Sequence, residues 1–226
     1  MRYESKIPFS HRASYSMRYS PMHTQTYYRR NMPYIVPLGA TLFVTFRLAG
    51  SLPIVVIQQL QTELEAAWDM ISQAIPVEEQ SAAAHRARKA YFGKFDAQLD
   101  GTAAGPDWLR QPAVAEVVKY EIELLAEPKV NILSYCIMPN HVHVVMQLPE
   151  VPEFSFGNLM HRLKGRTAYK ANQLLQRSGP FWQHESYDHL VRGTRELERI
   201  NAYVVMNPAK AGLVENWEEW PFTALL

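Results

Sequence analysis

The chain has 226 residues, enough for one domain with a sizeable core or for one domain with elaborations. Hydrophobic residues make up 47% of it and charged residues 20%, a balance that excludes wholesale disorder. The net charge of +1 excludes little, because a local basic face can be hidden within a neutral total.

Cysteine content and the length of apolar runs indicate in which cellular compartment the protein is expected. Cys136 is the single cysteine, which excludes an intramolecular disulfide framework and fits a reducing cytosol. The N-terminal sequence lacks the apolar stretch of a signal peptide, and no apolar run approaches the ~18 residues of a membrane-spanning helix. The sequence therefore predicts a cytoplasmic protein with no membrane partner.

Residues 1–33 differ in character from the rest of the chain. They carry six arginine or lysine residues against one acid, Glu4, and show neither helical nor strand periodicity. Two interpretations stay open: a flexible tail, or a basic arm that contacts phosphates. A single ordered domain is expected over residues 34–226.

The first expected elements are one strand and three helices. β-Branched and aromatic residues predict a strand at 41–48. Apolar residues on one side of a helix predict helices at 54–74 and 111–125, and an Ala-rich stretch with alternating charge predicts another at 79–99.

A hairpin follows, with strands expected at 130–138 and 142–148 and a turn at Pro139 and Asn140. The remaining expected elements are a basic helix at 156–175, an extended segment at 181–191 and a last helix at 194–207, ended by Pro208. With a closing strand near 185–191, the order of elements matches β-α-β-β-α-β. The sequence thus predicts an α+β fold with a ferredoxin-like core and an antiparallel sheet.

His141 and His143 are two residues apart at the second hairpin strand. Side chains two apart on a strand project from the same face, which leaves Val142 and Val144 for the core. Two neighbouring imidazoles can hold a divalent metal if a third ligand arrives from elsewhere. The alternative is a pair of partly exposed histidines on a sheet.

Tyr203 and Asn207 are four residues apart on the last helix, on one flank of its apolar stripe. A phenol and an amide oxygen would then be presented to the same point. The alternative is a packing tyrosine and an asparagine at a helix end.

Basic residues concentrate on the helix after the hairpin: Arg162, Lys164, Arg166 and Lys170. They are candidates for contacts with DNA phosphates, or else form a solvated helix face. Trp182 is a candidate for stacking on unpaired bases, or else closes the core.

Four segments resemble, in order and spacing, the REP-associated tyrosine transposases, a branch of the single-tyrosine HUH transposases in which U is a hydrophobic residue. They are CIMPNHVHVVMQLPE, LMHRLKGRTAYKANQLL, FWQHESYDHLVR and YVVMNPAKAGLVENWEEWPFTAL. The resemblance covers about 131 to the C-terminus and the strand at 41–48. Residues 54–126 are more helical than the minimal family core needs, which indicates a helical elaboration.

The resemblance implies a role for each candidate residue. His141 and His143 match metal ligands on a central strand, and Asn207 matches the third ligand. Tyr203 matches the nucleophile on a C-terminal helix. Transposases outside this branch often have Gln at the third ligand, so the shorter Asn207 is a departure shared with the branch. The implied activity is nicking and strand transfer of single-stranded hairpin DNA through a 5′-phosphotyrosine, with Mg²⁺ or Mn²⁺ as cofactor.

Two other functions stay open. One is a non-catalytic hairpin-DNA-binding protein derived from a transposase. The other is an unrelated metallohydrolase that uses His141 and His143 on a small molecule, with a third His or carboxylate ligand. The resemblance implies a nucleoid-associated location and leaves a homodimer open.

Overall fold

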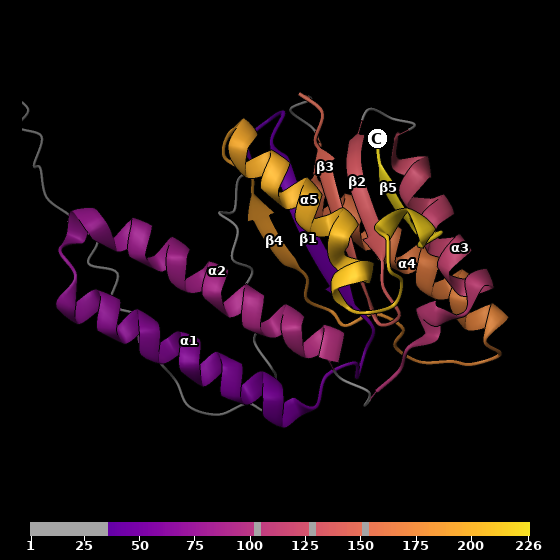
Figure 1. Cartoon of the computed structure of the whole chain (residues 1–226), viewed down its shortest axis with the longest axis horizontal. Helices are drawn as coiled ribbons and strands as arrows, with labels where there is room; N and C mark the ends of the chain where they lie inside the picture. The colour runs from indigo at the N-terminus through magenta and orange to yellow at the C-terminus, as the bar shows by residue number, and fades with distance from the viewer. Residues whose placement is uncertain (1–35, 102–104, 127–129, 151–153) are drawn as a thin grey trace, which may run out of the picture.

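The computed structural model describes residues 36–101, 105–126, 130–150 and 154–226 (Figure 1). The basic arm expected at residues 1–33 lies outside them. The helices and strands, in chain order, are β1 (Thr41–Arg47), α1 (Ile54–Ala74), α2 (Val77–Gly101), α3 (Pro112–Glu123), β2 (Asn131–Ile137), β3 (His141–Gln147), α4 (Phe156–Leu174), β4 (Tyr187–Leu190), α5 (Thr194–Lys210) and β5 (Thr223–Leu225). Among the described residues, no helix is long and apolar enough to cross a membrane.

The strands form one five-stranded antiparallel sheet in the order β4-β1-β3-β2-β5. Its first four positions are the strand arrangement of a β-α-β-β-α-β ferredoxin-like core, to which β5 adds an edge. The predicted fold class is therefore confirmed. The central strand is β3, which begins at His141.

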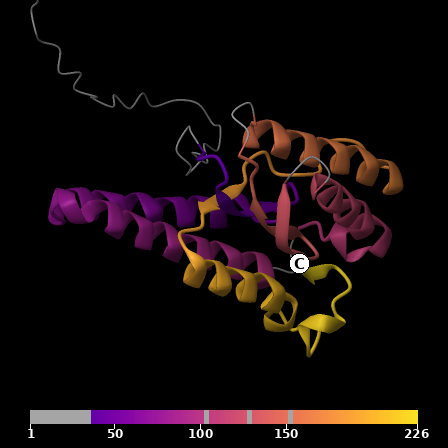
Figure 2. The same ribbon diagram turned by 90° about the horizontal axis from the view of Figure 1, so that it is seen from above.

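Helices cover both faces of this sheet (Figure 2). On one face, Val142 and Val144 of β3 lie in the larger hydrophobic core, which also contains the apolar sides of α3 and α4. On the other face, Val145 lies in a second core with Val204 of α5 and Phe92 of α2. Because strand side chains alternate, His141 and His143 point toward this second core, as expected.

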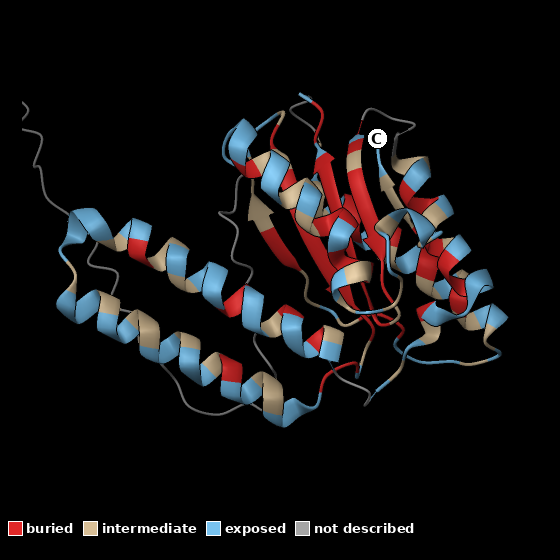
Figure 3. Ribbon diagram, viewed as in Figure 1, coloured by how far each residue is buried: buried red, intermediate tan, exposed pale blue. Residues whose placement is uncertain are grey.

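The helices α1 and α2 form a hairpin that projects beyond the β4 edge of the sheet (Figure 1). Leu60 is the buried residue of α1, whereas burial in α2 is greatest toward its C-terminal half, at Tyr91, Phe92, Asp96 and Leu99 (Figure 3). That half of α2 docks on the histidine face of the sheet. Within the elaboration expected at 54–126, α3 packs in the larger core, whereas no residue of α1 or α2 belongs to that core.

The expectation that Pro208 ends the last helix is wrong, because α5 continues to Lys210. A proline removes one backbone donor, but the final turn still closes: the Ala211 N–H donates to the Asn207 carbonyl at 2.9 Å. Asn207 thus lies within the helix. It shares one face with Tyr203 and Lys210, which are four residues before it and three after it.

Candidate active site

The two histidines of β3 meet at their Nε2 atoms. Both side chains are fully buried, and the two Nε2 atoms are 3.0 Å apart. Each Nδ1 has a partner on its other side: Asn140 Oδ1 at 2.7 Å from His141, and Thr45 Oγ1 at 2.7 Å from His143. Such partners orient metal-binding imidazoles in proteins. The arrangement directs both Nε2 atoms toward one point.

Asn140 determines which nitrogen of His141 carries the proton. The Asn140 amide donates from Nδ2 to the Leu99 carbonyl at 2.9 Å, so Oδ1 faces His141 and accepts from Nδ1. The Nε2 lone pair of His141 is then free for a ligand. Burial, and next the charge of His143, lower the pKa of His141 to about 3, so the ring is neutral near pH 7. Neutral imidazole is the form that binds metals.

A carboxylate from α2 joins the pair. Asp96 is fully buried, with Oδ1 at 3.3 Å from Nε2 of His143 and 3.8 Å from Nε2 of His141. Burial raises the pKa of Asp96, but attraction to His143 and a hydrogen bond from it outweigh this, so the net pKa lies below its usual value. One ligand atom from each of the three residues lies within 4.8 Å of the others. Two imidazoles and a carboxylate fit a divalent ion.

Tyr203 of α5 lies against the same cluster. Its ring centroid is 5.7 Å from that of His143, and its hydroxyl donates to Oδ2 of Asp96. The rings of Phe43 and Phe92 flank it at centroid distances of 6.1 Å and 6.2 Å. The structure thus brings the tyrosine of α5 to the histidines of β3.

Asn207, one turn beyond Tyr203, is fully buried, and neither atom of its amide has a hydrogen-bond partner among the described residues. An orphaned buried amide costs about 1–3 kcal/mol. A ligand at this point would remove that cost, so the residue fits the role of a metal ligand that the resemblance implies.

A second carboxylate, Asp100, lies one turn after Asp96 on α2. Its Oδ1 is 3.9 Å from Nε2 of His141, and its Oδ2 accepts from Nζ of Lys210 at 3.4 Å. Burial, and next repulsion from Asp96, raise the pKa of Asp100. The contact with Lys210 links α2 to α5 at the rim of the site.

The basic helix α4 lies on the opposite face of the sheet from the histidines (Figure 2). Arg166 and Lys170 form ion pairs with the buried Glu121 of α3 at 3.0 Å and 2.7 Å. Lys164 donates to backbone carbonyls before β4, and Arg162 is exposed. The structure therefore does not bring these four residues to the histidine cluster.

Trp182 lies in the main core, 7% exposed. Its indole N–H donates to Oγ1 of Thr167 at 2.8 Å, and its ring contacts Phe46 and Phe181, each at a centroid distance of 4.8 Å. The alternative interpretation, that this residue closes the core, describes what the structure shows.

Sequence reasoning missed four residues of the site: Thr45, Asn140, Asp96 and Asp100. One signal for Asp96 was available, since it shares a face of α2 with Phe92, four residues before, and Leu99, three after. A carboxylate in the middle of an apolar helix face indicates a buried partner. Asn140 was explained as a turn residue, and Thr45 as part of a strand.

Comparison with known proteins bears on the same residues. The family model described as IS200-like transposase matches residues 107–207. This range includes five residues of the site: Asn140, His141, His143, Tyr203 and Asn207. Asp96 precedes it.

Two relatives carry the name REP-associated tyrosine transposase. The protein from Haemophilus influenzae is 29% identical over 101 residues, which cover 41% of this chain and 57% of that protein. The protein from Escherichia coli is 25% identical over 93 residues, which cover 41% of this chain and 53% of that protein. The chain thus spans about half the length of these relatives.

Among solved structures, a REP-associated tyrosine transposase bound to a REP hairpin aligns with a TM-score of 0.48 and 17% identity, over 86% of this chain and 81% of that one. The resemblance inferred from the sequence is confirmed: over residues 107–207 this chain is similar to the IS200-like transposases, and its relatives include REP-associated tyrosine transposases.

Proposed function

We propose that this protein nicks and rejoins single-stranded hairpin DNA through a covalent bond to Tyr203, with a divalent metal bound beside it. One observation carries the proposal. The Tyr203 hydroxyl donates to Asp96, and the same carboxylate lies 3.3 Å from Nε2 of His143. The phenolic oxygen is thus next to the cluster that would hold the metal.

The metal would be held by Nε2 of His141 and His143 and an oxygen of Asp96, with the orphaned amide of Asn207 as a further ligand. Mixed nitrogen and oxygen ligands suit Mg²⁺ or Mn²⁺, and the imidazoles favour Mn²⁺. When bound, the ion would withdraw charge from a phosphodiester and stabilise the leaving 3′ oxygen.

The chemical step assigned to Tyr203 is a transesterification. Its phenolic oxygen attacks the phosphorus and the bond from phosphorus to the 3′ oxygen breaks, which leaves a 5′-phosphotyrosine and a free 3′-OH. Oδ2 of Asp96 already accepts the phenolic hydrogen bond and would take this proton, while the leaving 3′ oxygen takes up a proton from water. The phosphotyrosine keeps the energy of the phosphodiester. Attack by another 3′-OH therefore rejoins DNA, releases Tyr203 and needs no ATP.

The proposed substrate is a REP-type hairpin with single-stranded flanks, in keeping with the names of the relatives. Arg162 and the exposed part of Arg166 would contact phosphates on the α4 face, whereas Lys170 is held by its ion pair with Glu121. DNA that reaches both α4 and Tyr203 would then wrap around an edge of the sheet.

A non-catalytic hairpin-binding protein is the main alternative. The hypothesis of an unrelated metallohydrolase predicts a third His or carboxylate ligand, and Asp96 is such a carboxylate. It does not account for a tyrosine hydroxyl bonded to that same carboxylate, whereas the transesterification does.

The test is incubation of the protein with a labelled hairpin oligonucleotide and Mn²⁺ or Mg²⁺, followed by a denaturing gel. We expect a covalent protein–DNA adduct that disappears with EDTA and with Tyr203→Phe. Tyr91→Phe, at another buried tyrosine, should keep the adduct. Tight binding without an adduct, across several hairpins, would favour the non-catalytic alternative.

A further inference from the structure

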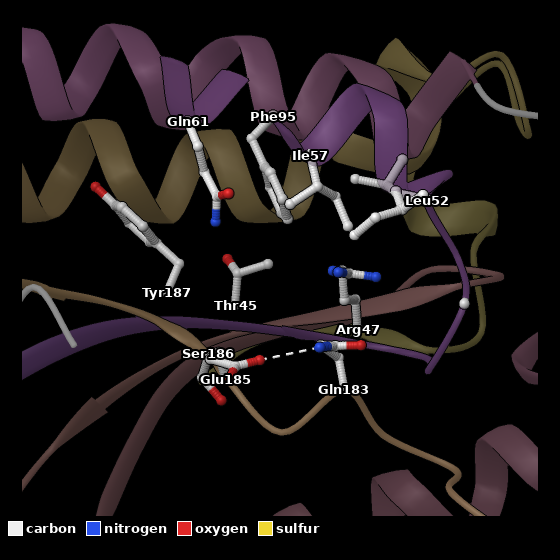
Figure 4. Close-up of a pocket in the computed structure, with 12 residues that line it drawn as sticks. Thr45, Arg47, Leu52, Ile57, Gln61, Phe95, Gln183, Glu185, Ser186 and Tyr187 are labelled. Carbon is white, nitrogen blue, oxygen red and sulfur yellow. Dashed lines mark hydrogen bonds between the residues drawn. The ribbon is translucent and has the colours of Figure 1, made fainter. Parts of the chain in front are cut away.

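We propose that a cavity beside the histidine cluster holds an unpaired nucleobase, next to the scissile phosphate of the DNA strand. The inference rests on the proposed function and concerns how that site would select its DNA. The cavity has a volume of about 340 Å³ and opens between the α1–α2 hairpin and the sheet (Figure 4). Sites for small molecules in proteins occupy about 300–1,000 Å³.

Thr45 connects the cavity to the site. It lines the cavity, and its Oγ1 lies 2.7 Å from Nδ1 of His143. Arg47, two residues further along β1 and on the same face, also lines the cavity and pairs in the sheet with His141. The cavity and the histidines are therefore neighbours on one face of the sheet. A strand bound with a phosphate at Tyr203 would have an adjoining base within reach of the cavity.

The side of the cavity formed by the helical hairpin is mainly apolar. Leu52 precedes α1, Ile57 belongs to α1, and Phe95 reaches the cavity from α2 (Figure 4). An aromatic side chain among aliphatic ones is the surface on which the flat face of a nucleobase packs.

The other side is polar and comes from the segment before β4. Gln183, Glu185 and Ser186 line it, and Gln61 adds an amide from α1 on the opposite side (Figure 4). Side-chain amides offer both donors and acceptors, as the edge of a base requires. The Gln183 amide donates to Oε2 of Glu185 at 2.9 Å, which orients this wall.

The charges of the cavity favour a base over a phosphate. Arg47 contributes one positive charge and Glu185 one negative charge, so there is no net attraction for an anion. The Arg47 guanidinium lies 5.7 Å from the Phe95 ring centroid and donates to Oγ of Ser51 at 3.1 Å. An uncharged aromatic ring with polar edges fits this combination.

Lys164 braces the polar wall. Its Nζ donates to the carbonyls of Gln183 and His184, at 2.6 Å and 2.8 Å, and to Oγ of Ser186 at 3.3 Å. The residue expected to contact phosphates therefore holds the segment that would read the base. The helices α1 and α2, which form the opposite wall, precede the range 107–207 matched by the transposase family.

The experiment measures binding of hairpin oligonucleotides by Tyr203→Phe, which cannot cleave them. Each nucleotide of the single-stranded flanks is replaced in turn by an abasic residue. We expect one flank position to lose affinity on the order of tenfold, since stacking of a single base contributes that much. Ile57→Trp in the same background fills the cavity, so it should weaken binding of the intact oligonucleotide by a similar factor. The double variant should bind the oligonucleotide that is abasic at the sensitive position as tightly as Tyr203→Phe alone does.

Val55→Trp is the matched control, because Val55 is 65% exposed on the same helix and does not line the cavity. It should behave like the parent. Gln61→Ala, which removes one polar group, should weaken discrimination among bases at the sensitive position and serves if Ile57→Trp does not fold. The proposal is overturned if every abasic replacement is tolerated, or if the sensitivity persists unchanged in both cavity variants.

The outcomes separate this inference from the proposed function. An adduct at Tyr203 in the wild type, without a cavity-dependent base, overturns the inference alone. A cavity-dependent base without any adduct supports the inference and leaves a DNA-binding protein that does not cleave. Absence of binding to every hairpin tested overturns both.

Discussion

Tyr203 donates a hydrogen bond to Asp96, although 107 residues separate them in the chain. The phenol belongs to α5, the carboxylate to α2, and the carboxylate also lies 3.3 Å from Nε2 of His143 on β3. One carboxylate thus touches both the candidate nucleophile and a candidate metal ligand. The C-terminal half of α2 is therefore part of the candidate site.

Asp96→Asn should weaken Mn²⁺ binding about tenfold or more, because the change removes the anionic ligand of the cluster. Isothermal titration calorimetry without DNA measures this directly. Asp100→Asn removes an equal charge one turn away and should cost less. Equal losses in the two variants would mean that both carboxylates act through overall charge, and that Asp96 is no ligand.

Asn207→Leu should separate metal binding from folding. The metal-free variant should be as stable as the wild type or about 1 kcal/mol more stable, because an orphaned buried amide is replaced by an apolar group of similar size. Its stabilisation by Mn²⁺ in thermal unfolding should be smaller, since the proposed amide ligand is removed. A clear loss of metal-free stability would show that the amide has a structural partner.

Thr45→Val should lower the affinity for Mn²⁺ about ten- to hundredfold, because the hydroxyl that holds Nδ1 of His143 is removed while the shape is kept. Thr45→Ser keeps the hydroxyl and should restore most of the affinity. The comparison by calorimetry excludes a general packing effect. If Thr45→Val and Thr45→Ser bind the metal equally well, something other than the Thr45 hydroxyl orients His143.

The stability of the metal-free protein should fall in mild acid. Burial lowers the pKa of His141 to about 3, from 6.5 for an ordinary histidine. Between these values the unfolded chain binds a proton that the folded chain does not, so stability present above pH 6.5 is lost as the pH falls. The loss between about pH 7.5 and 5 should be roughly 2 kcal/mol.

Urea unfolding in EDTA at several pH values measures this slope. His141→Gln cannot take up the proton and should flatten it. If the variant and the wild type lose stability in parallel, another group is responsible.

Two residues of α4 should behave differently when each is changed to alanine. Arg162 is exposed, so Arg162→Ala should weaken binding of hairpin DNA and leave the stability of the fold unchanged. The slope of the logarithm of DNA affinity against the logarithm of salt concentration should become smaller by about one. Lys170 pairs with the buried Glu121 at 2.7 Å, so Lys170→Ala should destabilise the fold by about 1 kcal/mol. Fluorescence anisotropy at several salt concentrations and urea unfolding distinguish the two effects. Loss of DNA affinity without loss of stability in Lys170→Ala would contradict the structural role.

Local patterns in the sequence predicted most elements well. The helix expected at 54–74 is present with those bounds, and the strand expected at 41–48 differs by one residue. Both predictions depend only on residues that are close to one another in the sequence. The end of α5 was misplaced, because closure of its last turn depends on carbonyl groups that remain available around Pro208.

Longer-range features could not be predicted in this way. The pattern of α4 identifies its apolar side, at Leu159, Leu163 and Ala171, but not which face of the sheet that side covers. The helix covers the face opposite the histidines, so its basic residues lie away from the candidate active site. Trp182 was left open between a base platform and a core residue, and its partners Phe46 and Phe181 decide for the core.

The sequence by itself determined that His141 and His143 share a face of one strand, and that Tyr203 and Asn207 share a face of one helix. Those statements follow from the side-chain period, which is two residues in a strand and 3.6 residues in a helix. The local backbone conformation alone determines this period. The tertiary structure decided that Asp96 meets them and that a cavity adjoins them. Those contacts join elements about 40 to 110 residues apart. They arise from burial of apolar surface between α2, α5 and the sheet, which has no signature in any one segment.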